Sequence, residues 1–153
     1  LWQGRSAEVV PMLQAVEDGP LPATTLVAAY MVRAGQIEET RAYLAEHTPD
    51  LAPENWFSLL NWSCAAEVAA GIGDRELGEA ALRLLAPYAG RLASAGSGSA
   101  IGPVDAFLAL AAYAVGDLPR ATAHAEDAMA LCEEWQIPLV AQWLSDQRDR
   151  WGF

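Results

Sequence analysis

Residues 102–135 read GPVDAFLALAAYAVGDLPRATAHAEDAMALCEEW and form the clearest helix-turn-helix pattern in the chain. Apolar and small side chains recur at helical spacing from Phe107 to Val115, and again from Ala121 to Cys132. Gly116-Asp117 separates the two runs, as a turn between helices would. Two helices of about four turns each cannot bury their apolar faces alone, so this unit needs neighbours.

The same pattern occurs twice upstream. Ile37, Leu77 and Leu118 each follow a glycine-containing turn, and they lie 40 and 41 residues apart. The glycine supplies the positive φ of a helix C-cap, and a small residue three positions later lets the paired helices approach closely. The sequence therefore predicts an all-α protein of seven or eight helices, a right-handed α-α superhelix, in a single domain. Its three units span about 21–48, 54–91 and 102–135, with flanking helices at 7–18 and 138–151.

Between the second and third units, residues 93–103 read ASAGSGSAIGP. Small side chains supply little packing area, so we expect a long loop inside the domain. The stretch is glycine-rich and precedes a helix, which superficially suggests phosphate binding. It lacks the lysine and the preceding strand that this chemistry requires, so a loop is the better interpretation.

The charge of the chain limits its partners. The 153 residues include nine arginines, no lysine and twenty carboxylates, for a net charge of −11. Such a chain repels phosphate backbones and anionic lipid, so neither nucleic acid nor membrane is an expected partner. A basic peptide or another protein domain fits better; the alternative is that the charge only keeps the surface solvated. The sequence starts at Leu1 and shows no signal peptide or membrane-spanning run, so we expect a cytoplasmic fragment of a larger protein.

No motif in the sequence indicates an enzyme. The chain lacks a nucleophile elbow, a GxxxxGK[ST] phosphate loop and an HExxH motif, so we predict no catalytic residue and no cofactor. His124 and Asp127 lie three residues apart on a predicted helix and could supply two metal ligands, but the sequence places no third. A solvated helix face is the better interpretation, and no metal site is predicted. Cys64 and Cys132 are expected to be buried thiols.

Trp62, Ala65 and Ala69 match the large-small-small packing pattern in the first helix of a tetratricopeptide repeat (TPR), and Ala121 and Ala128 match small positions of its second helix. The units are longer than the standard repeat of about 34 residues, so loops or longer helices must absorb the difference. More narrowly, about 130 residues resemble the C-terminal TPR region of large bacterial, actinobacterial-type regulators. That resemblance implies a nucleotide-binding ATPase core before the repeats, and a LuxR-type DNA-binding domain or a cyclase domain elsewhere in the parent protein.

In a right-handed stack of helix pairs, the first helices line a concave groove that can hold an extended peptide or a helix. Ser63 and Glu67 are polar residues on an otherwise apolar helix, which favours a wet, partner-facing surface; a solvent channel or a neighbouring helix explains them equally well. The residues expected on the concave side are Thr25, Val32, Arg33, Leu60, Ser63, Glu67, Ala106, Leu110 and Tyr113.

The expected function is a non-catalytic interaction or regulatory module of a bacterial transcriptional regulator or signalling ATPase. It would dock a protein segment, or a neighbouring domain of the same chain, in the groove and so shift the conformation of the parent protein. The alternative is a domain that senses a small-molecule effector. A pocket enclosed on three sides favours the sensor, and an open groove favours the interaction module.

Overall fold

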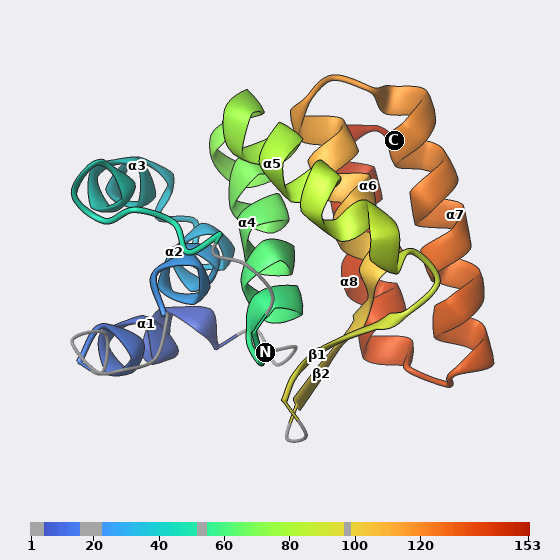
Figure 1. Cartoon of the computed structure of the whole chain (residues 1–153), viewed down its shortest axis with the longest axis horizontal. Helices are drawn as coiled ribbons and strands as arrows, with labels where there is room; N and C mark the ends of the chain where they lie inside the picture. The colour runs from blue at the N-terminus through green and yellow to red at the C-terminus, as the bar shows by residue number, and fades with distance from the viewer. Residues whose placement is uncertain (1–4, 16–22, 52–54, 97–98) are drawn as a thin grey trace.

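The computed structural model describes residues 5–15, 23–51, 55–96 and 99–153. Within these ranges the chain forms eight α-helices, one short 3-10 helix and a two-stranded hairpin (Figure 1). The mostly helical fold that the sequence predicts is thereby confirmed, with the hairpin as a departure. The elements are α1 Ser6–Gln14, α2 Thr24–Arg33, α3 Ile37–Glu46, α4 Ser58–Ile72, α5 Arg75–Leu85, η1 Ala86–Tyr88, β1 Leu92–Ala95, β2 Ser99–Pro103, α6 Val104–Ala114, α7 Leu118–Glu134 and α8 Pro138–Trp151.

Consecutive helices pair across short glycine turns. The pairs α2 and α3, α4 and α5, and α6 and α7 fall within the three predicted units, while α1 and α8 fall at the flanking positions; residues 16–18 of the first predicted flanking helix lie outside the described residues. Gly35, Gly73 and Gly116 occupy the turns with φ values of 78°, 73° and 81°. Asp74 and Asp117 follow two of these glycines and accept backbone N–H groups in the first turns of α5 and α7, which caps both helices.

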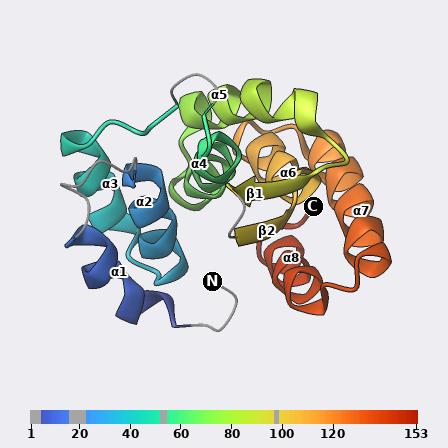
Figure 2. The same ribbon diagram turned by 60° about the horizontal axis from the view of Figure 1, so that its bottom comes forward.

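Helix α4 lies at the centre of the molecule, where it contacts α2, α5 and α6 (Figures 1 and 2). Its alanines Ala65, Ala66 and Ala69 have no exposed surface, and such small side chains let neighbouring helices approach closely. A Cβ atom built on Gly71 would lie 2.4 Å from Cγ1 of Val32, so α2 and α4 nearly touch there. This contact sets the register of α2 against α4.

The stretch 93–103 is not the loop that the sequence predicts, because its ends pair as the antiparallel strands β1 and β2. Ala93 and Ile101 are buried in the main core, and Gly102 packs against Val140 of α8 with a φ of 123°. Alanine, serine and glycine have low strand propensity, so the sequence carries no strand signal. The hairpin forms because its buried side chains pack on the helices. Its tip, residues 97–98, lies outside the described residues.

We predict that Ala66→Trp or Ala121→Trp destabilises the fold by more than about 3 kcal/mol, because both side chains are fully buried at helix crossings and cannot accommodate an indole. Urea unfolding followed by circular dichroism measures this effect. The matched control is Ala123→Trp on the exposed side of α7, which should change stability by no more than about 0.5 kcal/mol. Equal effects at buried and exposed positions would contradict the packing described above.

The thiol of Cys64 is predicted to be unreactive in the folded protein. It is buried on α4, and that burial raises its pKa to about 12, so almost no nucleophilic thiolate exists at pH 8. Iodoacetamide should modify Cys64 only after denaturant is added, as mass spectrometry of the tryptic peptides can show. Modification within minutes under native conditions would mean that α4 opens readily.

Candidate functional site

A surface pocket with a volume of about 300 Å³ opens between α1, α2 and α4 on one side and α8 on the other. Figure 2 shows α1 and α2 on the left, α4 at the upper centre and α8 below and to the right of it. We call this cavity the Arg33 pocket. Its lining includes Val32 and Arg33 of α2, Glu67 of α4, and Trp143 and Trp151 of α8.

Arg33 and Glu67 form a bidentate ion pair in this pocket. Nε of Arg33 donates to Oε1 of Glu67 and Nη2 donates to Oε2, each over 2.6 Å. The side chains are only 10% and 3% exposed, so solvent screens the pair little. Burial alone would lower the pKa of Arg33, but the carboxylate of Glu67 outweighs it and raises that pKa above its ordinary value. The guanidinium of Arg33 therefore stays charged.

Aromatic rings surround the guanidinium of Arg33. Its Cζ atom lies 5.9 Å from the ring centroid of Tyr30 and 5.5 Å from that of Trp143, within the range of a cation–π contact. Burial raises the pKa of Tyr30. Trp143 also packs against Phe107 of α6, with centroids 5.6 Å apart. Trp143 thus connects α8 to both α2 and α6 and forms a wall of the pocket.

Three of the nine residues expected on the concave side line this pocket: Val32, Arg33 and Glu67. The other six do not. Five of them are buried on α2, α4 and α6, where α2 and α6 both pack on α4, and the hydroxyls of two of the five have no hydrogen-bond partner. The sixth, Tyr113, is half-buried, and its ring stacks on that of Trp151 with the ring centroids 5.2 Å apart. The five buried residues are Thr25, Leu60, Ser63, Ala106 and Leu110, of which Thr25 and Ser63 have the unpartnered hydroxyls, and the sixth is Tyr113.

Sequence reasoning missed the contribution of α8, which it treated as a flanking helix. Leu139, Trp143, Asp146 and Arg150 of α8 all line the pocket. A signal was present, because Leu139, Trp143 and Arg150 recur at helical spacing along one side of that helix. The sequence shows this stripe but not which part of the molecule it faces.

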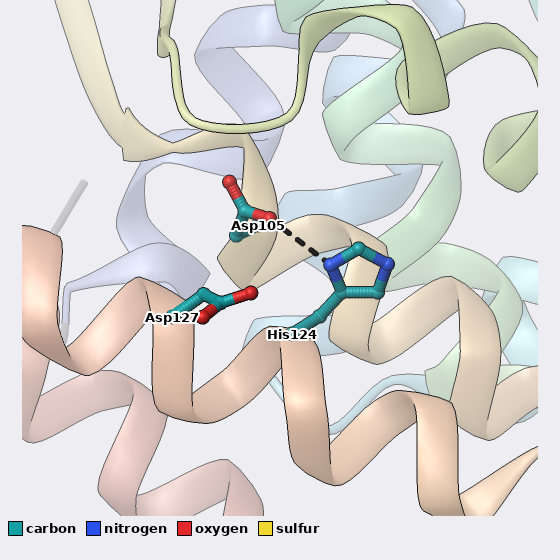
Figure 3. A group of neighbouring side chains, drawn as sticks. All are labelled: Asp105, His124 and Asp127. Atoms are coloured by element: carbon teal, nitrogen blue, oxygen red, sulfur yellow. Dashed lines mark hydrogen bonds and ion pairs between the residues drawn. The ribbon is translucent and has the colours of Figure 1, made fainter.

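A second group of polar side chains lies where α6 begins, beside α7. Figure 3 shows Asp105 of α6 and His124 and Asp127 of α7 pointing toward one another. Nδ1 of His124 donates to Oδ1 of Asp105 over 3.0 Å, and the backbone N–H of Gly90 donates to Oδ2 over 2.6 Å. Burial would raise the pKa of Asp105, but these hydrogen bonds outweigh it and hold that pKa below its ordinary value. The sequence alone identifies no third potential metal ligand near His124 and Asp127. In the structure, Asp105 lies beside them.

No helix among the described residues is long and apolar enough to cross a lipid bilayer. Neither a protein family, nor a curated protein, nor a solved structure matches the chain in comparisons with known proteins.

We predict that Glu67→Met alone destabilises the protein by about 3–5 kcal/mol, because it leaves the charge of Arg33 buried without its carboxylate. The double variant Arg33→Met, Glu67→Met should recover most of this loss, since two apolar side chains of similar volume replace the pair. Urea unfolding of both variants measures the difference. A loss below about 1 kcal/mol in the single variant would show that water screens the pair.

Proposed function

We propose that this chain is a non-catalytic interaction module of a cytoplasmic bacterial transcriptional regulator or signalling ATPase, and that it binds a protein segment or a neighbouring domain of its parent in the Arg33 pocket. The observation that carries the proposal is a pocket with a buried ion pair at its wall and aromatic side chains beside it. Such a mixture of apolar area and a few fixed charges is typical of recognition sites.

The order of helix contacts supports the proposed repeat architecture. Helix α1 packs on α2, α2 on α4 and α4 on α6, and each of α2, α4 and α6 also packs on the helix that follows it. This succession of paired helices is expected of a TPR-like right-handed superhelix. We propose that architecture for the chain, with the Arg33 pocket on its concave side.

The rim of the pocket favours a peptide with an apolar anchor and a basic side chain. Leu139 is 61% exposed at the rim, where a partner could cover it together with Trp143. The carboxylate of Asp146 and the guanidinium of Arg150 both line the same pocket, so the attraction for a basic segment comes from the net charge of −11 of the whole chain. The charge of the chain would therefore attract a positively charged segment from a distance, and the carboxylate of Asp146 could then form an ion pair with it.

A small-molecule effector is the second candidate, and the size of the cavity favours it. About 300 Å³ is at the lower end of the range for ligand pockets, and four helices contribute walls. An effector held there would contact α2, α4 and α8 together. It would act on the parent protein by stabilising one arrangement of these helices.

The test uses the full parent protein with a photoreactive amino acid in place of Leu139. The matched control carries the same amino acid in place of Leu118, which is 45% exposed on α7 and does not line the pocket. We expect the Leu139 derivative to crosslink to one protein segment, identified by mass spectrometry, while the Leu118 derivative does not.

A synthetic peptide of the crosslinked segment then provides an affinity measurement. Leu139→Asp should weaken its binding at least tenfold, because it places a charge on the apolar rim, and Leu118→Asp should leave it unchanged. If no protein crosslinks and native mass spectrometry of the purified protein shows a bound small molecule that Leu139→Asp releases, the effector alternative is correct. If neither a protein nor a small molecule occupies the pocket, both proposals are wrong.

A further inference from the structure

We propose that Asp105, His124 and Asp127 form a binding site for a single divalent transition-metal ion, with Zn²⁺ as the best fit. Each residue offers one ligand atom, and these atoms lie within 4.8 Å of one another. The three side chains come from the start of α6 and from the middle of α7 (Figure 3). The site is separate from the Arg33 pocket, and the proposal does not depend on the proposed function.

The donor set matches the chemistry of zinc. One imidazole nitrogen and two carboxylate oxygens are common zinc ligands, with a fourth position left to water. Bonds of about 2.0–2.2 Å in tetrahedral geometry place ligand atoms roughly 3.4 Å apart. Asp127 is exposed, so rotation of its side chain can bring its oxygen nearer to the other two ligands. An ion would then replace the hydrogen bond between His124 and Asp105.

The surroundings hold the first ligand in place. The side chain of Asp105 is only 3% exposed, and the N–H of Gly90 fixes its Oδ2 atom. A ligating carboxylate held by an outer hydrogen bond is a usual feature of metal sites. His124 and Asp127 lie three residues apart on α7, so they project from the same side of that helix. Packing of α6 against α7 keeps all three together.

This grouping of potential metal ligands occurs at one place among the described residues. The chain contains twenty carboxylates and two histidines, yet among the described residues these three make up the one group of three or more potential ligands that comes this close. The other histidine, His47, contacts the backbone carbonyl of Tyr43 and stacks on its ring. Two carboxylates beside one imidazole also give the site a negative charge, which favours a cation.

Isothermal titration of the chain with ZnCl₂, after removal of any affinity tag, tests the proposal. We expect one ion per chain, with at least tenfold weaker binding by Asp127→Asn and loss of saturable binding by His124→Ala. Matched controls are His47→Ala and Asp149→Asn, which change the same residue types outside the site and should bind Zn²⁺ like the parent chain. Circular dichroism establishes that each variant is folded.

Asp127 is exposed, so Asp127→Asn decides the question if His124→Ala does not fold. Zn²⁺ should also raise the thermal midpoint of the parent chain and not that of Asp127→Asn, because an ion that binds only the folded state stabilises it by mass action. Absence of saturable Zn²⁺ binding would overturn the proposal. So would binding that Asp127→Asn leaves unchanged, because the ion would then sit elsewhere.

Discussion

Close contact between helices that carry alanine and glycine where they meet is the constraint on which this structure depends. Helix α4 has neighbours on several sides, and larger side chains at Ala65 or Ala69 would push those neighbours away. The near contact of Gly71 with Val32 fixes how far α2 slides along α4. Because of that register, Arg33 meets Glu67 and α8 can reach Arg33. The pocket is thus a consequence of the small residues where α2 crosses α4.

We expect the ion pair between Arg33 and Glu67 to contribute specificity more than net stability. Removing two charges from water costs about as much as their attraction returns, so apolar side chains of similar size could fill the same space. A bidentate pair, however, is satisfied in only one relative position of two helices. It therefore favours this arrangement of α2 and α4 over shifted ones, and it leaves charged groups at the wall of a cavity where an incoming ligand can reach them.

Local patterns in the sequence predict the helices well, because apolar periodicity and glycine turns are properties of neighbouring residues. Gly35, Gly73 and Gly116 stand at the turns for that reason. Which face of a helix becomes buried depends on partners that are distant in the sequence. For that reason Thr25 and Ser63, which the sequence predicts in a groove, lie buried between helices. Asp105 is 19 residues from His124, and only the packing of α6 on α7 brings them together. The hairpin escaped prediction because burial, rather than propensity, stabilises its strands.

The contact between Trp143 and Arg33 joins the last helix to the second one. An open array of repeats can lose its end units one at a time, because each unit contacts only its neighbours. Here α2 and α8 meet at the guanidinium of Arg33, and that guanidinium is bound to the central helix α4. Loss of α8 would expose the buried pair, and loss of α2 would remove half of it. Unfolding of α8 is therefore coupled to unfolding of α2, and these helices are expected to unfold with α4 as one cooperative unit.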